Sequence, residues 1–140
     1  MRRQSTNAES GDDLSEEDGT AYAESVAVEH HDHTRVHVSG MTSEEPHDDV
    51  GEQTRDILER IEGAVERAGG EMSDVVRVRV YVVESHLSQS GFEAIHAARR
   101  EFFDPGTYPA STLVEVAGLI REDRLIEIDA DAVIPHDGWD

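Results

Sequence analysis

The segment that most constrains the fold is the run VVRVRVYVV, residues 75–83. Successive side chains of a β-strand point to opposite sides, so Val76, Val78, Val80 and Val82 are expected to share one face. Arg77, Arg79 and Tyr81 would share the other. A strand with one apolar and one charged face fits a sheet that helices cover on one side only.

Two segments that flank this strand have helical periodicity. In residues 48–70 the apolar residues recur at spacings of three and four, Asp48 or Asp49 supplies an N-cap, and Gly69 with Gly70 ends the pattern. Residues 88–103 repeat the spacing through Phe92, Ile95, Arg99 and Phe102, and the DPGTYP run at 104–109 breaks it. We therefore expect two amphipathic helices.

The remaining apolar runs read as strands. Residues 22–30 and 34–40 form a predicted hairpin, and residues 111–120 and 125–135 form the two final strands. The predicted order is β-β-α-β-α-β-β. Right-handed crossovers place both helices on one face of a mixed sheet, which gives an α/β (α+β) two-layer sandwich.

The uncovered sheet face is expected to be mostly polar. It would carry Arg35, His37, Ser39, Arg77, Arg79, Tyr81, Leu113, Glu115, Glu127, Asp129 and Asp131. Antiparallel sheets often leave such a face in water. Tyr81 and Leu113 among the charges favour the other interpretation, a subunit interface.

Length and charge bound the class of protein. A chain of 140 residues fits one domain, which we predict at residues 20–140. Residues 1–19 are acidic and are predicted to be a disordered tail, either a solvated segment or a docking arm. The net charge is -20, and all 12 basic residues are arginine. The negative charges repel one another, and concentrated salt screens this repulsion, so we expect a halophilic protein from a salt-rich cytoplasm. The alternative is that the acidic tail accounts for much of the negative net charge.

The same composition disfavours several partners. The chain has no basic patch for nucleic acid or anionic membranes, no long apolar stretch for spanning a membrane, and no cysteine. His30, His31 and His33 with Asp32 lie at a predicted hairpin tip, where alternate side chains point apart, so no metal site is expected. No glycine loop for phosphate is present, and we expect no cofactor.

Five runs together carry a family resemblance: VSG at 38–40, residues 53–82, FEAIHAARREFF at 92–103, YPASTLVEVAGL at 108–119 and IEIDADAVIP at 126–135. In this order, from Tyr22 to Pro135, the chain resembles the RidA (YjgF) family of imine and enamine deaminases. The resemblance implies a chorismate-mutase-like fold, a homotrimer and small-metabolite sites in the clefts between subunits.

The resemblance also implies site residues. Glu127 matches the carboxylate that holds the attacking water, and Ser39 with Gly40 match the strand end that contacts substrate. His96 stands where deaminases commonly have asparagine, and Tyr22 is a candidate pocket wall. The deaminases read Pro-Ala-Arg-Ser/Thr, whereas Pro109 and Ala110 are followed here by Ser111 and Thr112.

The missing arginine leaves two functions open. Ser111 and Thr112 can hydrogen-bond a substrate, and Arg77 either takes over anion binding or pairs with Glu127 or Asp129. One interpretation is an enzyme that hydrolyses reactive imines or related metabolites, with Glu127 taking a proton from water. The other is a stress-protective or metabolite-binding trimer that has lost deaminase activity.

Overall fold

The computed structural model describes residues 1–7, 21–46 and 49–140. Its strands and long helices, in chain order, are β1 Arg2–Asn7, β2 Ala23–Glu29, β3 His33–Thr42, α1 Val50–Arg67, β4 Val75–Val83, α2 Gln89–Arg100, β5 Ala110–Val116 and β6 Ile126–Pro135. Short 3₁₀ turns precede β4, α2 and β5.

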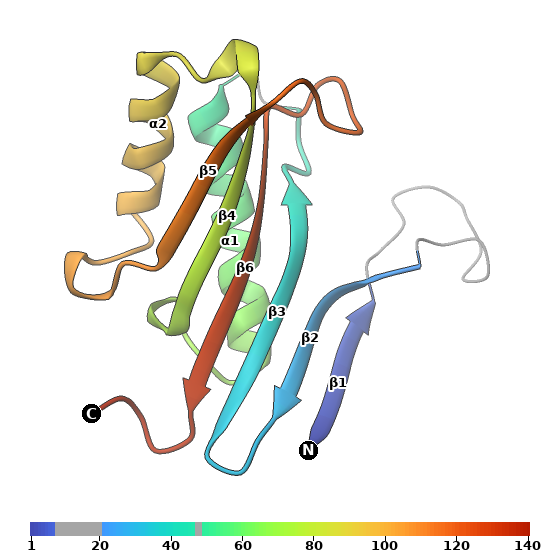
Figure 1. The fold of residues 1–140 in the computed structure, drawn as a ribbon, viewed down its shortest axis with the longest axis vertical. Helices are drawn as coiled ribbons and strands as arrows, with labels where there is room; N and C mark the ends of the chain where they lie inside the picture. Colours follow the sequence, from blue (N-terminus) through green and yellow to red (C-terminus); the bar gives the residue numbers. More distant parts are fainter. Residues whose placement is uncertain (8–20, 47–48) are drawn as a thin grey trace.

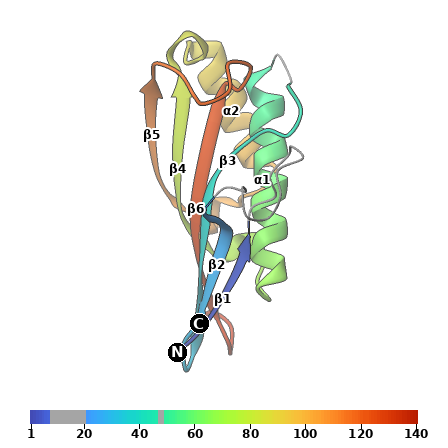
Figure 2. The ribbon, with the colours of Figure 1, turned by 90° about the vertical axis from the view of Figure 1, so that its right-hand side faces the viewer.

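The strands form one sheet in the order β1-β2-β3-β6-β4-β5 (Figure 1). Only the β4–β5 pair is parallel, and the other neighbours are antiparallel. Both helices pack on the same face, so the molecule has two layers (Figure 2). This is the predicted two-layer α+β architecture on a mixed sheet.

The core lies between these layers. Ile57, Leu58 and Ile61 of α1 and Ile95 of α2 are buried against the alternating apolar residues of β4 and β6. Asp49 caps α1, accepting hydrogen bonds from the backbone N–H groups of Gly51 at 2.6 Å and Glu52 at 3.1 Å. Gly69, with a φ of 95°, follows the end of the helix in the left-handed region that glycine tolerates best.

The beginning of the chain differs from the prediction. Residues 2–7 were expected in a disordered tail, yet they form β1, which pairs antiparallel with β2. All six side chains are exposed, so backbone hydrogen bonds, not apolar burial, attach this strand to the sheet edge. Residues 8–19 of the predicted tail lie outside the described part of the chain.

Two strand faces also differ from the prediction. A register shift between Val75 and Arg77 leaves Val76 38% exposed and buries Val75 instead. Leu113 was expected on the open face, but it packs against the core because β5 pairs it with the buried Val80. By the same pairing, Glu115, opposite the buried Val82, belongs to the helix-covered face.

No helix among the described residues is long and apolar enough to cross a membrane. The C-terminal segment folds back on the helix-to-strand turn after α1. The indole Nε1 of Trp139 donates a hydrogen bond of 2.7 Å to the buried carboxylate of Asp74. A small surface hollow, lined in part by Trp139 and Gly70, lies there.

Candidate functional site

Glu127 lies on the open face of the sheet, opposite Thr42 of β3 and Tyr81 of β4. The β3–β6 register shifts here: Ser39 and Gly40 together face Asp129, so β3 carries a bulge of one extra residue. A Cβ added to Gly40 would lie 2.9 Å from Oε2 of Glu127, closer than such contacts normally come. Glycine at position 40 therefore lets the β3 backbone approach the Glu127 carboxylate.

A network of charged side chains continues from Glu127 along β6. Nη1 of Arg79 donates to carboxylate oxygens of Asp129 at 2.7 Å and Asp131 at 3.1 Å. Nδ1 of His37 lies 2.7 Å from Asp131, and the Tyr81 hydroxyl donates to Asp129 at 3.4 Å. Arg79 thus pairs with both Asp129 and Asp131. Glu127 is the carboxylate at the end of this network that Arg79 does not neutralise.

Burial raises the pKa of the Glu127 carboxyl, and the neighbouring charge of Asp129 raises the pKa further. Both effects disfavour the ionised form. A half-buried carboxylate with a raised pKa accepts a proton more readily than an exposed one at neutral pH. Glu127 is therefore a partly buried carboxyl group with a raised pKa beside the β3 bulge.

Ser39 connects the β3 bulge to β2, where Tyr22 is the residue before Ala23. The hydroxyl of Ser39 donates a hydrogen bond of 2.6 Å to the backbone carbonyl of Ala23, which ties the β3 bulge to the start of β2. Tyr22 comes directly before Ala23 and is 55% exposed. We call Tyr22, Ser39, Gly40 and Glu127 the Glu127 cluster; Ser39 has a structural role in it through this bond.

Ser111 lies elsewhere. It pairs with the core residue Val78 in the β4–β5 register, so its side chain belongs to the helix-covered face. There Nη1 of Arg99, from α2, donates a hydrogen bond of 3.0 Å to the Ser111 hydroxyl. Sequence reasoning treated Arg99 only as a member of the helical spacing. The signal that could have singled it out was an arginine on the stripe that otherwise faces the core.

His96 lies one turn before Arg99 on α2. Its ring packs on that of Phe92 at 4.3 Å between centroids, and Phe92 is 47% exposed. Burial lowers the pKa of His96, and the charges of Arg99 and Arg100 lower the pKa further. We call Phe92, His96, Arg99 and Ser111 the α2–β5 corner.

Arg77 and Thr112 contact each other on the open face. Nη2 of Arg77 donates a hydrogen bond of 2.6 Å to the Thr112 hydroxyl. Within the described residues Arg77 makes no ion pair with Glu127 or Asp129, unlike its neighbour Arg79. The adjacent residues Ser111 and Thr112 therefore point to opposite faces of the sheet and cannot hold one small ligand together within a single chain.

Six of the predicted site residues thus divide into two groups, and the contacting pair Arg77 and Thr112 belongs to neither. The Glu127 cluster lies on the open face, because Ile126 and Ile128 on either side of Glu127 are buried under the helices. The α2–β5 corner lies on the opposite face, at the sheet edge that β5 forms. One chain holds a carboxyl group in the first group and cationic and hydroxyl groups in the second, with the sheet between them.

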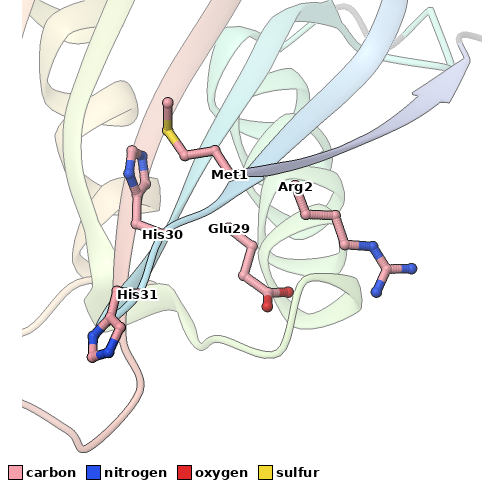
Figure 3. A pocket seen from close by; sticks show the side chains of 5 residues that line it. All are labelled: Met1, Arg2, Glu29, His30 and His31. Atoms are coloured by element: carbon pink, nitrogen blue, oxygen red, sulfur yellow. The ribbon is translucent and has the colours of Figure 1, made fainter.

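A second surface hollow, beside the turn between β2 and β3, is lined by Met1, Arg2, Glu29, His30 and His31 (Figure 3). Met1 and His30 lie near each other there, whereas the Arg2 side chain points away (Figure 3). The rings of His30 and His33 stack at 4.4 Å, and His33 contacts Asp32 at 2.6 Å. Among the described residues, no group of three potential ligands could hold a metal ion.

The fold and the Glu127 cluster define the class of protein. The chain matches the family model described as "Endoribonuclease L-PSP" over residues 19–134. The chain therefore belongs to the endoribonuclease L-PSP family, also known as the YjgF/RidA family.

Solved structures agree with this assignment. A member of the highly conserved YjgF/YER057c/UK114 family from Mycobacterium tuberculosis is 33% identical, with a TM-score of 0.76 over 95% of this chain and 100% of the other. A Pseudomonas aeruginosa protein of unknown function is 30% identical, with a TM-score of 0.74 over 99% of both chains. RidA from an Antarctic Psychrobacter is 25% identical, with a TM-score of 0.68 over 82% and 89%.

Proposed function

We propose that this protein hydrolyses small reactive imines or enamines, with Glu127 as the general base. The observation that carries the proposal is the Glu127 carboxylate itself: half-buried, with a raised pKa, and approached by the β3 backbone at Gly40. Membership of the family that includes RidA supports the same chemistry.

In the proposed reaction Glu127 accepts a proton from a water molecule as the water oxygen attacks the carbon of the C=N bond. The C–N bond of the resulting carbinolamine then breaks, and the nitrogen leaves with the transferred protons as ammonia. The product is the corresponding carbonyl compound. This hydrolysis requires no oxidant and no cofactor.

We further propose that the working site forms between copies of the chain, in a trimer. Glu127 and the α2–β5 corner lie on opposite faces of one sheet, so a ligand can reach both only where one copy's open face meets another copy's corner. Exposed apolar side chains near both regions support such a contact: Tyr22 at 55%, Phe92 at 47% and Val114 at 41%. A head-to-tail interface that closes into a ring brings unlike surfaces together in this way.

Cleavage of RNA, the activity that the family description names, fits this chain poorly. Phosphate backbones bind through clustered cations that release counterions. With a net charge of -20, and with Arg79 on the open face already paired to Asp129 and Asp131, the surface repels a polyanion. We therefore expect a small metabolite, not RNA, as the ligand. The net charge of -20 leads us to expect a salt-rich cytoplasm as the location of the protein.

The test is ammonia release from freshly generated 2-iminopropanoate at molar salt, for the wild type, Glu127→Gln and Glu115→Gln. Glu115 is an exposed carboxylate in β5, so its replacement is a matched control for charge. We expect Glu127→Gln to lose at least about a hundredfold in turnover and Glu115→Gln to stay within about twofold. Equal rates for Glu127→Gln and the wild type would refute the role of Glu127.

Absence of turnover by the wild type, beside a working deaminase, would favour the second candidate, a metabolite-binding trimer. The specific observation for that candidate is Ser111, which is neutral where an active deaminase of the resembled pattern has arginine. In that case Glu127→Gln would leave ligand affinity almost unchanged, because a binder has no need of a base.

A further inference from the structure

The turn between α1 and β4 holds a buried carboxylate that no cation neutralises. Asp74 is 5% exposed, and it is the only nearly fully buried carboxylate among residues 1–7, 21–46 and 49–140. Its Oδ1 accepts a hydrogen bond from the indole Nε1 of Trp139 at 2.7 Å, and its Oδ2 accepts one from the backbone N–H of Glu71 at 2.9 Å. Both donors are neutral. No ion pair within the described part of the chain includes Asp74.

Glu71 adds a second carboxylate to the same turn. The side chains of Glu71 and Asp74 form a reciprocal capping box, in which each accepts a hydrogen bond from the backbone N–H of the other residue. The Ser73 hydroxyl also donates to Glu71, at 2.9 Å. Asp56 likewise accepts only from neutral donors, but it is half-buried and lines neither of the two surface hollows. The turn therefore combines two negative charges whose hydrogen-bond partners are all neutral.

These two carboxylates line the hollow beside the C-terminal segment, which we call the Trp139 hollow. Its volume is about 300 Å³, at the lower end of the size range of ligand pockets. Glu71 and Asp74 are the only charged residues that line it, and three glycines, Ile134, Pro135 and Trp139 complete the lining. Trp139 is 58% exposed although its N–H group is bonded to Asp74, because that group lies at the edge of the ring. The faces of the indole ring thus remain accessible to a ligand.

An accessible indole ring beside carboxylates that lack a cation is suited to an organic cation. The ring quadrupole attracts a positive charge placed over its face, and tryptophan is the strongest of the aromatic side chains in this respect. Arg67, which ends α1 just before the turn, does not supply this charge, since its Nη2 contacts Glu24 at 3.6 Å. A metal ion suits the hollow less well, because no group of three potential ligands among the described residues could hold one.

We propose that the Trp139 hollow binds a small methylated ammonium cation, with the indole ring of Trp139 over its positive charge and the carboxylates of Glu71 and Asp74 beside it. Methyl groups suit this lining because Ile134 and Pro135 offer apolar contacts. The two carboxylates already accept hydrogen bonds from N–H and O–H groups of the protein, so their attraction for the ligand is a charge interaction that requires no ligand N–H group.

This binding site is independent of the hydrolysis proposed for Glu127. Glu127 lies near the start of β6 and Pro135 ends that strand, so the length of β6 separates the two regions. The match to the family model ends at residue 134, so Trp139 lies outside the matched residues. Binding of a cation in the Trp139 hollow and turnover at Glu127 can therefore be tested separately.

The probe is choline, compared with dimethylbutanol, an uncharged analogue of the same shape in which carbon replaces nitrogen. Each is titrated into the full-length protein at constant ionic strength. Trp139 is the only tryptophan of the chain, so intrinsic tryptophan fluorescence reports on the hollow directly. Glu71→Gln and Asp74→Asn each remove one lining carboxylate. Asp140→Asn is the matched control, because Asp140 follows Trp139 in the chain but does not line the hollow.

We expect choline to change the fluorescence of Trp139 saturably, and dimethylbutanol to bind at least about tenfold more weakly. Glu71→Gln and Asp74→Asn should each weaken choline binding by about fivefold or more, and Asp140→Asn by under about twofold. Trp139→Leu, followed by NMR saturation transfer to the methyl protons of choline, should weaken binding by about tenfold or more.

Several results would overturn the inference. They are the absence of a saturable change in the wild type, equal binding of choline and dimethylbutanol, equal affinities of Glu71→Gln and Asp140→Asn, and undiminished binding by Trp139→Leu. Asp74 is buried, so circular dichroism is used to check that Asp74→Asn retains the fold. Should that variant unfold, the comparison of Glu71→Gln with Asp140→Asn decides the question, because Glu71 and Asp140 are both exposed.

Discussion

Replacement of Gly40 by alanine should disturb Glu127 and little else. The new Cβ would lie 2.9 Å from Oε2 and 3.0 Å from Cδ of Glu127, whereas ordinary contacts begin at 3.4 Å. The carboxylate must therefore move by about 0.5 Å or change rotamer. Because the clashing atoms are the end of a flexible side chain, we expect the free energy of unfolding to change by under about 1 kcal/mol.

The effect on turnover should be larger than the effect on stability. A misplacement of about 1 Å at a catalytic group can cost roughly a hundredfold in rate, so a shift of half that size should cost about tenfold, or about 1.4 kcal/mol in activation free energy. The assay is ammonia release from 2-iminopropanoate at saturating and limiting substrate, together with urea unfolding of the same samples.

The control is Gly106→Ala, where an added Cβ meets nothing within 4 Å. It should leave both turnover and stability unchanged. Full activity in Gly40→Ala, with the carboxyl NMR signal of Glu127 unmoved, would refute the claim that the β3 bulge positions this carboxylate. Equal losses in the two alanine variants would refute it as well.

Other predictions concern the charge of Glu127, the core and the C-terminal segment. Because the pKa of Glu127 is raised and the base must be ionised, kcat/KM should begin to fall with decreasing pH at a pH above the usual glutamate range. Asp129→Asn should move this acid-side fall to lower pH, but the pKa of Glu127 should stay raised because burial is the larger cause. An acid-side fall at an unchanged pH in Asp129→Asn would contradict this. Leu58→Ala, at a side chain 1% exposed, should lower the free energy of unfolding by about 2–5 kcal/mol in urea titrations, and a loss under 1 kcal/mol would contradict the packing. Trp139→Phe removes the hydrogen bond to Asp74 and should lower the free energy of unfolding by about 1 kcal/mol. The loss is smaller than for a buried donor because Trp139 is 58% exposed. An unchanged urea midpoint would show that the C-terminal contact is not formed in solution.

Periodicity predicted the architecture well because each long element buries one regular face. The 3- and 4-residue spacing of α1 and the alternation of β6 determine which side chains meet the core, so the two-layer sheet with helices on one face followed directly. Prediction was wrong where pairing, not composition, decided the outcome. Residues 2–7 are polar and acquire strand structure only through the edge of β2.

A register shift explains the wrong face predicted for Val76, whereas Leu113 and Glu115 were misplaced because their face is set by the pairing of β5 with β4. A one-residue shift moves a side chain to the other face of a sheet, and nothing in the sequence marks the shift at Val75–Arg77. The same limit applies to the site. Glu127 and Gly40 were selected by family resemblance, and their contact depends on a bulge in β3 that no local pattern indicates. Arg99 was missed because its hydrogen bond to Ser111 depends on how the fold places α2 beside β5.

The proposal that Glu127 and the α2–β5 corner of different copies form one site is tested most directly by mixing two inactive variants. Glu127→Gln removes the base from one surface, and Ser111→Phe fills the corner on the other. In a head-to-tail ring, random mixing of equal amounts gives both intact contributions at about a quarter of the sites. We expect the separate variants to be almost inactive in ammonia release and the reassembled mixture to recover about a quarter of wild-type turnover. A mixture no more active than its parents, beside an active wild type, would contradict a site shared between copies, and an inactive wild type would contradict hydrolysis itself.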